Sequence, residues 1–335
     1  MNTLILDQEQ VKQLLSMGHC ITLMREALST LARGASINPL RFVFRPDGIS
    51  RLLSMMPAYE NVSELLGMKI VTVSKRSQES RYDAHQGLVV LFDPEHGAPS
   101  AIFEASSITA IRTAAVSAVA TDLLAEPQAG DLAILGSGVQ ARAHLEAMAL
   151  IRPLRRIRVF SRDVDNRRAF VAYAANSLGI KVEPMPAVRD ALEGADLVCS
   201  TTSSVSPIVE GRWLEPGSHI NAVGSCIPTA REFDTDAMRR VRLFVDSRES
   251  TANESGDFVM AVRDGGIRED AIVCEIGELL LGRREGRSSP ADITLFKSLG
   301  LAVEDLAAAR YVLSQAEERR MGVRVDLGGR RHADG

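Results

Sequence analysis

Cysteine is scarce in this sequence, and its cysteines show no paired spacing. The 335 residues contain four of them, far apart and without a C-x-x-C pattern: Cys20, Cys199, Cys226 and Cys274. This distribution favours buried, reduced thiols over disulfides or a zinc site. We therefore predict no metal, and we expect the reducing environment of the cytoplasm.

Aromatic residues, basic clusters and long apolar runs are also sparse. One tryptophan and four tyrosines are available for stacking on bases, the arginines are scattered, and the net charge is −4, which argues against a nucleic-acid-binding protein. Residues 1–10 lack the basic-then-apolar layout of a signal peptide, and no apolar run looks long enough to cross a bilayer. We expect neither a nucleic acid nor a membrane among its partners.

One glycine-rich turn is the most informative feature present. An apolar run over 132–135 ends in Gly136-Ser-Gly-Val-Gln-Ala141, and a helical segment over 139–150 follows. This is the strand, turn and helix of a dinucleotide-binding βαβ unit, in which Gly136 permits the tight turn and Gly138 lets a pyrophosphate approach. The helix N-terminus would direct its N–H groups at that pyrophosphate. The alternative is an ordinary βα turn, since the motif alone is weak evidence.

The next strand ends in Ser161 and Arg162, where an NAD site usually carries an acid for the ribose 2′-hydroxyl. An acid would repel a 2′-phosphate, whereas Arg162 can bind one bidentately, so we predict a preference for NADPH over NADH. Asp163 is better placed as a helix N-cap, but NADH would be accepted too if its carboxylate faced the ribose. The alternative for Arg162, Arg167 and Arg168 is a solvated, basic helix start.

The order of elements predicts an α/β protein of two domains. We place a Rossmann NAD(P)-binding domain at 126–301, and an α+β substrate-binding domain at both chain ends, 1–125 plus 302–335. Helices are expected over 7–34, 107–124 and 301–321. The expected strands are 40–44, 52–56, 68–74, 88–92 and 101–103, followed by 157–161, 180–184, 197–201, 220–223 and 241–246.

Three cations of the first domain stand among apolar neighbours: Arg41, Lys69 and Arg112. Burying a cation without a partner is costly, so each needs a carboxylate or an anionic ligand. An internal salt bridge, or a solvated face for Arg41, would explain any one of them. Three in one small domain favour a substrate that carries a carboxylate.

Several ordered motifs carry a family resemblance. They comprise Arg41, Met56-Pro57-Ala58-Tyr59, Lys69 and the segments 111–115, 136–141, 216–224, 254–257 and 296–305. Together they resemble the ornithine cyclodeaminase/mu-crystallin family over nearly the whole chain. The resemblance implies a homodimer, with an N-terminal domain that binds substrate and supplies most of the subunit interface. It also implies hydride transfer between NAD(P) and an amino or imino acid.

Two departures from the family pattern point to one branch. Ornithine cyclodeaminases carry a glutamate for the distal amine two residues before the Met-Pro pair, where this chain has Ser54. They also carry an aspartate where this chain has Ser225, and a serine cannot act as a carboxylate general base. In both respects the chain is similar to mu-crystallin and bacterial ketimine reductases, which reduce Δ1-pyrroline-2-carboxylate and Δ1-piperideine-2-carboxylate.

A cyclic ketimine has a carboxylate beside its C=N carbon, and the resemblance suggests how it would bind. Arg41 and Arg112 would clamp the carboxylate, Lys69 would assist them, and Ser54 would lie beside the substrate. Lys69, or Ser225 through a water, would return the proton, and the sequence does not choose between them.

Most of the candidate cofactor-binding residues lie at the ends of expected strands, whereas Thr113 lies in the helix expected over 107–124, and Ser298 and Gly300 precede the last helix. Capping of loop amides is an equal alternative for the two adjacent threonines. The full set is Thr113, Gly136, Ser137, Gly138, Val139, Gln140, Ser161, Arg162, Thr201, Thr202, Val223, Ser225, Ser298 and Gly300.

Three hypotheses follow. The first is an enzyme that uses NADPH, with NADH possible, to reduce cyclic ketimines to L-proline or L-pipecolate. The second is an amino-acid dehydrogenase or cyclodeaminase acting on alanine, ornithine or lysine, and Ser54 and Ser225 argue only against its ornithine version. The third is a non-catalytic NADPH-binding protein. The three cations argue against it, because a protein that only binds NADPH would not need to bind a carboxylate.

Overall fold

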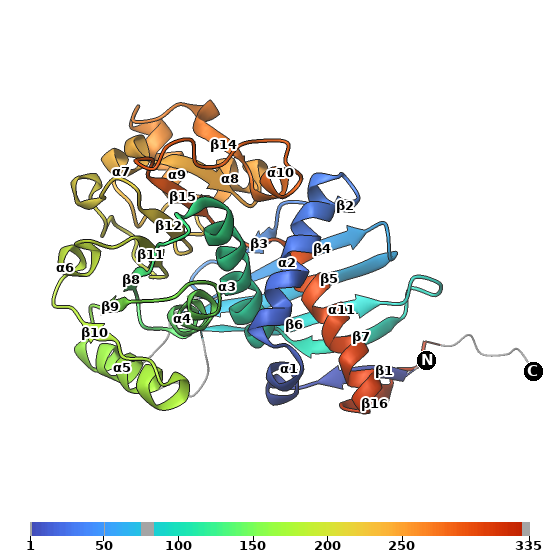
Figure 1. Ribbon diagram of the computed structural model, residues 1–335. Coiled ribbons are helices and arrows are strands. Elements are labelled where there is room, and N and C mark those ends of the chain that lie inside the picture. The colour runs from blue at the N-terminus through green and yellow to red at the C-terminus, as the bar shows by residue number, and fades with distance from the viewer. Residues whose placement is uncertain (1, 50, 75–83, 330–335) are drawn as a thin grey trace, which may run out of the picture. The chain divides into compact units, whose positions relative to one another are not determined.

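The computed structural model describes residues 2–49, 51–74 and 84–329 (Figure 1). Residues 330–335 of the expected C-terminal segment therefore lie outside the described residues. Contacts divide the chain into unit 1, residues 1–112 with 301–335, and unit 2, residues 113–300. The division falls inside helix α3 (Ala105–Leu124), whereas the sequence analysis placed it after residue 125.

Unit 1 is built on a mixed sheet in the order β16-β1-β7-β6-β5-β4-β2, with β3 paired to β4. The strands nearest the two ends of the chain, β1 and β16, were not predicted. β1 pairs in parallel with β7 and antiparallel with β16. The strands are β1 (Asn2–Leu6), β2 (Ser36–Ile37), β3 (Phe42–Phe44), β4 (Arg51–Glu60), β5 (Leu65–Ser74), β6 (His85–Phe92), β7 (Pro99–Glu104) and β16 (Val323–Asp326).

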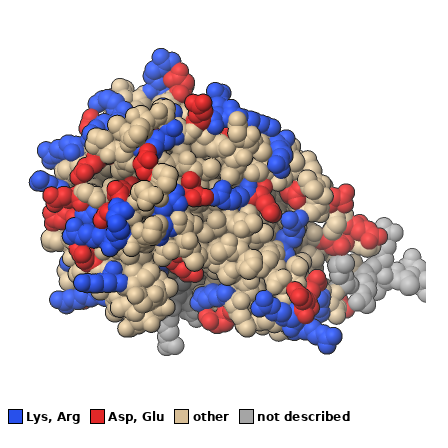
Figure 2. Space-filling view, in the orientation of Figure 1, with Lys and Arg blue, Asp and Glu red and all other residues tan. Residues whose placement is uncertain are grey.

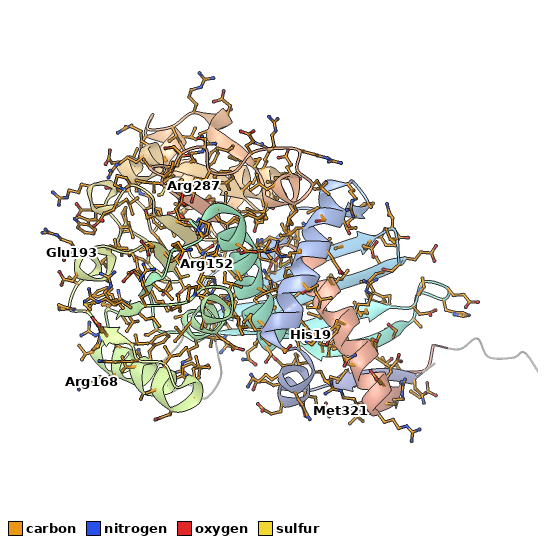
Figure 3. All side chains as sticks on the ribbon, in the orientation of Figure 1. His19, Arg152, Arg168, Glu193, Arg287 and Met321 are labelled. Atoms are coloured by element: carbon orange, nitrogen blue, oxygen red, sulfur yellow. The ribbon has the colours of Figure 1, made fainter. Side chains whose placement is uncertain are left out.

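The helices of unit 1 cover one face of this sheet. They are α1 (Gln8–Leu14), α2 (Met17–Ala32) and α11 (Ala302–Arg319), and α11 packs on α2 and on β4, β5 and β6. The single helix expected over 7–34 is wrong, because Ser16 starts a second helix and its side chain accepts the backbone N–H of His19. His19 also stacks on Tyr311, joining α2 to α11 (Figure 3).

Alternation along the strands gives the sheet of unit 1 two different faces. Lys69 pairs with Met56 on β4 and Val89 on β6, all buried on the face beneath α11. The opposite face carries another row across four strands, and its two outer members, Phe42 and Leu88, are 58% and 46% exposed. The sheet thus has one covered face and one apolar, uncovered face.

Unit 2 contains a sheet in the order β10-β9-β8-β11-β12-β15-β13-β14, and every recorded pairing in it is parallel. Numbered from β8, the first five strands run 3-2-1-4-5, the order of a dinucleotide-binding fold. The predicted α/β class with a Rossmann sheet is confirmed. The strands are β8 (Asp131–Leu135), β9 (Arg156–Phe160), β10 (Glu183–Pro184), β11 (Leu197–Ser200), β12 (His219–Ala222), β13 (Arg242–Val245), β14 (Ile272–Glu275) and β15 (Thr294–Lys297).

Helices flank this sheet, and its strands form a continuous apolar core with residues such as Leu135, Ile220 and Leu295. Besides α3, the helices of unit 2 are α4 (Val139–Ile151), α5 (Val164–Leu178), α6 (Val188–Leu192), α7 (Thr235–Arg240), α8 (Arg248–Glu254), α9 (Gly256–Arg263) and α10 (Ile276–Leu280), with 3₁₀ turns at Gly211–Trp213 and Glu269–Ala271.

Helix α3 corrects the expectation that no apolar run is long enough to cross a bilayer. Among the described residues it is the one helix long and apolar enough, by length and composition, to span a membrane, and 78% of its most apolar window is buried. At its C-terminal end, Arg152 donates to the carbonyl of Thr121 at 3.2 Å, and Arg287 donates to that of Leu124 at 2.9 Å (Figure 3). The carbonyl of Leu124 is one that the last helical turn leaves without a backbone donor, whereas that of Thr121 also accepts the backbone N–H of Ala125 at 2.9 Å.

On the face that Figure 2 draws, charged side chains are spread rather than gathered by sign. Figure 2 shows basic and acidic residues interspersed on the face in view. Several pair locally, as Arg156 does with Glu183 at 2.7 Å and Arg231 does with Asp264 at 2.9 Å. All four cysteines are unbridged, three of them buried and Cys226 partly so.

Candidate functional site

The glycine turn of unit 2 has the strand, turn and helix that the sequence predicts. β8 ends at Leu135, Gly136 adopts a φ of +109°, and α4 begins at Val139 with Gly138 as its N-cap. A Cβ at Gly136 would lie 2.8 Å from Oγ1 of Thr201, so a larger residue would displace the neighbouring loop. Because Gly138 has no side chain, its position offers no competing acceptor for the first N–H groups of α4.

The residues beside this turn present polar and partly exposed groups. The Ser137 hydroxyl donates to that of Ser161 at 2.9 Å, which joins the loops after β8 and β9. The Val139 side chain is 46% exposed, and Gln140 is partly buried. These groups lie at the carboxyl edge of the parallel sheet, where dinucleotides bind in this fold.

The three arginines after β9 have different partners. Asp163 caps α5 and accepts a backbone N–H at 2.8 Å, as predicted. Arg167 donates to two backbone carbonyls, and Arg168 lies 3.5 Å from Asp165. Arg162 is exposed, and within the described residues no carboxylate lies at salt-bridge distance from it. Arg162 is therefore the one of the three for which the described residues provide no carboxylate partner or backbone carbonyl acceptor.

The threonines after β11 are engaged by their own chain. Thr201 Oγ1 donates to the carbonyl of Leu135 at 3.0 Å. Thr202 donates to Oε1 of Glu232 from its backbone N–H at 2.8 Å and from its hydroxyl at 2.6 Å. Both hydroxyl protons are therefore used inside the protein. The third threonine, Thr113, is buried in α3.

The loop after β12 holds Ser225 in an uncommon conformation. The φ of Ser225 is +61°, its side chain is buried, and its hydroxyl donates to the carbonyl of Ala230. Val223 continues the sheet through a 2.8 Å bond from its N–H to the carbonyl of Ser200. The hydroxyl proton of Ser225 is thus used inside its own loop, which counts against Ser225 as a proton donor.

The loop after β15 is fixed by a residue that sequence reasoning missed. Oδ2 of Asp246 accepts the backbone N–H groups of Leu299 at 2.6 Å and Gly300 at 2.7 Å. Ser298 is buried in this loop, and its N–H donates to the carbonyl of Ala222 at 3.0 Å. Asp246 stands directly after β13, so its place at a strand end was the available signal.

Unit 1 brings two of the three predicted cations together with carboxylates from α11. Lys69 Nζ lies 2.7 Å from Oδ2 of Asp305 and 3.5 Å from the hydroxyl of Thr109. Arg112 donates from Nε to Oδ1 of Asp305 at 2.9 Å and from Nη1 to Oε2 of Glu304 at 2.7 Å. Lys69, Arg112, Glu304 and Asp305 are all at most 3% exposed. Asp305 is the shared partner that joins the two cations.

Arg41 and Ser54 belong to the same region of unit 1. Arg41 precedes β3, is partly buried, and is close enough to Lys69 to lower the pKa of that lysine. Ser54 is buried on β4, on the face shared with Lys69, and within the described residues its hydroxyl has no hydrogen-bond partner. Thus the four predicted substrate-binding residues all lie in unit 1, and Asp305 pairs with two of them, Lys69 and Arg112.

Burial controls the protonation of this cluster. It lowers the pKa of Lys69 to about 8, with a further decrease from Arg112 and a partial increase from Asp305. Burial also raises the pKa of the nearby Cys20 thiol far above its usual range, which keeps that thiol neutral. Lys69 is therefore the group in this cluster whose proton can move near neutral pH.

The expectation that three cations await an external carboxylate needs correction. Asp305 pairs with both Lys69 and Arg112, and Glu304 pairs with Arg112, so two of the three cations already have acidic partners. The internal salt bridge that the sequence analysis weighed is therefore present, because an unpaired buried cation would be too costly. Both acids lie in the first turn of α11, where the helix dipole favours negative charge.

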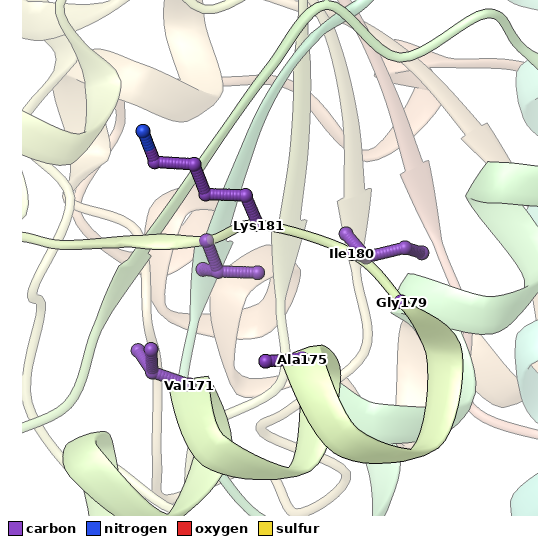
Figure 4. Close-up of a pocket in the computed structure, with 6 residues that line it drawn as sticks. Val171, Ala175, Gly179, Ile180 and Lys181 are labelled. Carbon is purple, nitrogen blue, oxygen red and sulfur yellow. The ribbon is translucent and has the colours of Figure 1, made fainter.

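A separate hollow lies near the end of α5. It is lined by six residues that include Val171, Ala175 and Lys181 (Figure 4). These residues precede β10 in the chain and so lie toward the amino edge of the sheet, opposite the edge where dinucleotides bind. Among the described residues, no group of three His, Cys, Asp or Glu side chains is arranged to hold a metal.

Comparison with known proteins identifies the family of this chain. The model of the ornithine cyclodeaminase/mu-crystallin family matches residues 1–320. Ketimine reductase mu-crystallin of Mus musculus is 37% identical over 292 residues, which is 86% of this chain and 89% of that protein.

Two solved structures are similar over nearly the whole chain. A Thermococcus litoralis Δ1-pyrroline-2-carboxylate reductase in complex with NADH and L-proline has a TM-score of 0.94 and 34% identity, covering 96% of this chain and 100% of that one. An archaeal alanine dehydrogenase dimer with bound NAD has a TM-score of 0.91 and 30% identity, covering 98% and 100%. This chain belongs to the ornithine cyclodeaminase/mu-crystallin family.

Proposed function

We propose that this protein uses NAD(P)H to reduce cyclic ketimines, Δ1-pyrroline-2-carboxylate and Δ1-piperideine-2-carboxylate, to L-proline and L-pipecolate. The observation that carries the proposal is the grouping in unit 1 of the buried Lys69 and Arg112 with the partly buried Arg41. Two guanidinium groups and a lysine suit a substrate that carries a carboxylate. The similar reductase of T. litoralis was solved with L-proline and NADH bound.

The residues of unit 2 fit a dinucleotide. Gly136 leaves no room for a side chain beside Thr201, and at Gly138 nothing lies within 4 Å of where a Cβ would be, so backbone is open there to an approaching pyrophosphate. The N-terminus of α4 begins at the same turn and supplies N–H groups and a positive dipole end. When bound, the reduced nicotinamide supplies the hydride.

Unit 1 binds the substrate carboxylate and holds Arg112 in one orientation. Glu304 and Asp305 accept hydrogen bonds from two different nitrogens of Arg112, so the guanidinium plane is fixed before substrate binds. Arg41 adds a second guanidinium group to the same region of unit 1. A carboxylate held by fixed guanidinium groups is bound in one orientation, which is what hydride transfer to the adjacent carbon needs.

Lys69 supplies the proton at Nζ. A lysine with a pKa of about 8 is mostly protonated at neutral pH, yet it loses its proton far more readily than an ordinary lysine. The hydroxyl of Ser225 is committed to the carbonyl of Ala230. Of the two candidate proton donors, Lys69 is the one we assign to the imine nitrogen.

NADPH is the proposed physiological coenzyme. Arg162 is exposed at the end of β9, and the carboxylate of Asp163 is occupied in capping α5. A guanidinium attracts a 2′-phosphate, and the Asp163 carboxylate accepts a helix N–H instead of binding the ribose. NADH remains a weaker substitute, since the rest of the turn does not depend on that phosphate.

The subunits are proposed to pair through the uncovered face of the unit 1 sheet. Two rows cross its strands: Phe42, Met55, Ile70 and Leu88 form one, and Ile37, Tyr59, Leu66 and Phe92 form the other. In these rows Phe42, Ile37, Leu66 and Leu88 are between 45% and 58% exposed. A contiguous apolar face of this kind is typical of a protein interface, and a second copy is the occupant we propose. The similar archaeal alanine dehydrogenase is a dimer.

One set of assays tests the proposed reaction. Purified protein is mixed with NADPH or NADH and, in turn, the five- and six-membered ketimines, pyruvate with ammonia, and ornithine. Rapid oxidation of NADPH with the ketimines alone is the expected result. Turnover only with pyruvate and ammonia would favour an alanine dehydrogenase, to which the chain is also similar. Ammonia release from ornithine would favour a cyclodeaminase, and tight coenzyme binding without turnover would favour a binding protein.

A further inference from the structure

A second buried charged cluster lies in unit 2, and none of the steps above uses it. It consists of Glu232, Asp257 and Lys297, each at most 1% exposed. Lys297 Nζ lies 3.0 Å from Oδ2 of Asp257 and also donates to the carbonyl of Gly224. Oδ1 of Asp257 accepts the backbone N–H of Glu232 at 2.7 Å. One lysine thus faces two acids, which leaves one formal negative charge.

The carboxylate of Glu232 holds the loop after β11. Its Oε1 accepts the hydroxyl of Ser200 at 2.8 Å, the N–H of Thr202 at 2.8 Å and the hydroxyl of Thr202 at 2.6 Å. Three donors on one oxygen offset much of the cost of burying that carboxylate. They also fix both the backbone and the side chain of Thr202.

The other oxygen of Glu232 faces the loop after β12. A Cβ on Gly224 would lie 2.4 Å from Oε2 of Glu232 and 2.3 Å from the carbonyl of Thr202, so the two loops touch through a glycine. Within the described part of the chain Oε2 has no hydrogen-bond donor. Burial and the nearby Asp257 raise the pKa of Glu232, as expected for a buried carboxylate whose Oε2 has no donor among the described residues.

The place of this cluster in the sheet connects it to the cofactor. β8, β9 and β10 form the first mononucleotide half, next to the glycine turn, and β11 and β12 begin the second half. Glu232 binds Ser200 and Thr202 at the carboxyl end of β11, and Lys297, the last residue of β15, donates to the carbonyl of Gly224 just after β12. The second half takes the nucleotide that the glycine turn does not, which is the nicotinamide end.

We infer that Glu232 is a positioning residue: with Asp257 and Lys297 it fixes the loops after β11 and β12 and so orients the nicotinamide half of the bound coenzyme. The inference deepens the proposed function, because it rests on the use of a nicotinamide coenzyme. A role confined to packing would weaken every ligand of unit 2 alike. A role in orientation weakens only ligands that carry the nicotinamide.

The test compares two ligands that differ only in the nicotinamide: NADPH and 2′-phospho-ADP-ribose. Their dissociation constants are measured by calorimetry for the wild type, Glu232→Gln and Glu215→Gln. Glu215 is a matched control, since it also accepts a loop N–H, from Gly194 at 2.9 Å, but it lies before β12 at the other sheet edge.

We expect Glu232→Gln to bind NADPH about tenfold more weakly, as for the loss of one charge-assisted bond, with lower kcat and affinity for the nicotinamide-free ligand changed less than about twofold. Glu215→Gln should bind both ligands as the wild type does. If Glu232→Gln does not fold, Thr202→Val removes one donor and should produce a smaller loss for NADPH alone.

Parallel weakening of both ligands, or unchanged binding of both, would overturn the inference and leave the proposed reaction standing. Failure of the wild type to bind either NADPH or NADH would instead refute the coenzyme assignment, and the inference with it.

Discussion

The carboxylate of Asp305 lies 2.7 Å from Nζ of Lys69, and its other oxygen lies 2.9 Å from Nε of Arg112. A residue on α11 therefore sets the charge of the lysine and the orientation of the arginine at once. Since Asp305 is fully buried, water screens neither interaction. Changes at Asp305 should appear first in how activity depends on pH.

Asp305→Asn should move the alkaline limb of the pH profile to lower pH. In the wild type the lysine donates its proton, so kcat/KM for reduction, which reports the free enzyme, should be level below a pKa of about 8 and fall as pH rises through it. The aspartate raises the pKa of Lys69, so its removal lowers that pKa further and the decline begins earlier. Steady-state kcat/KM measured across this pH range with a ketimine substrate reports the shift.

Glu304→Gln is the control for that experiment, because Glu304 contacts Arg112 at 2.7 Å. It should lower kcat/KM with a smaller displacement of the limb. A profile for Asp305→Asn that coincides with the wild type, or that moves to higher pH, would exclude Lys69 as the proton donor.

Arg112→Ala should weaken both catalysis and folding. Loss of hydrogen bonds to a charged substrate group should lower kcat/KM by the equivalent of about 1.5–3 kcal/mol. The variant also leaves Glu304 and Asp305 short of a buried partner, which should cost about 3–5 kcal/mol of stability. Kinetics are measured below the melting transition. Arg112→Lys keeps the charge without the planar guanidinium, so its kcat/KM should lie between those of the wild type and Arg112→Ala. An unaltered kcat/KM would remove Arg112 from the site.

The nucleotide half of the fold could be predicted because its signals are local. An apolar strand, the turn at Gly136 and the helix after it are contiguous in the chain, and the capping role of Asp163 depends on a residue three positions away. Strands without such context were missed. Thr294–Lys297 is short and follows an irregular segment, so nothing nearby distinguishes it from a loop.

The partners of the buried cations could not be predicted, since they are distant in the sequence. Arg112 meets Asp305 across 193 residues and Glu304 across 192. Sequence pattern shows that a buried arginine needs an acid, but it does not show which one. The same applies to Glu232 and Lys297, which only the folded sheet brings together.

Arg162→Asp should reverse the coenzyme preference. The guanidinium that attracts the 2′-phosphate is replaced by a carboxylate that repels it and can bind the ribose hydroxyls. Charge-assisted bonds of about 1.5–3 kcal/mol correspond to a change of roughly ten- to a hundredfold in the ratio of kcat/KM for NADPH to that for NADH. Arg168→Asp is the control, because Arg168 is exposed near Asp165 and should leave the ratio unchanged. A constant ratio in Arg162→Asp would refute the 2′-phosphate assignment.

Gly136→Ala should abolish tight coenzyme binding. Its φ of +109° is unfavourable for any residue with a Cβ, and that Cβ would lie 2.8 Å from Oγ1 of Thr201. The backbone strain alone should cost about 1–3 kcal/mol. Gly179→Ala is a matched control, since Gly179 also has a positive φ, +66°, but faces open space. Melting temperature should fall in both variants, and the dissociation constant for NADPH should rise only in Gly136→Ala. Equal coenzyme binding by the two would show that the turn does not contact the dinucleotide.

Leu88→Arg should convert the proposed dimer into monomers. Leu88 is 46% exposed in the row that runs through Ile70 and Met55 to Phe42, so in a dimer it would lie inside the apolar contact. A charge buried there without a partner costs several kcal/mol in each subunit, and a symmetric interface contains it twice. Light scattering after gel filtration gives the mass. Val205→Arg is the control, because Val205 is 70% exposed in unit 2 and should not affect assembly. A monomeric wild type, or a Leu88→Arg variant that stays dimeric, would show that this face does not join the subunits.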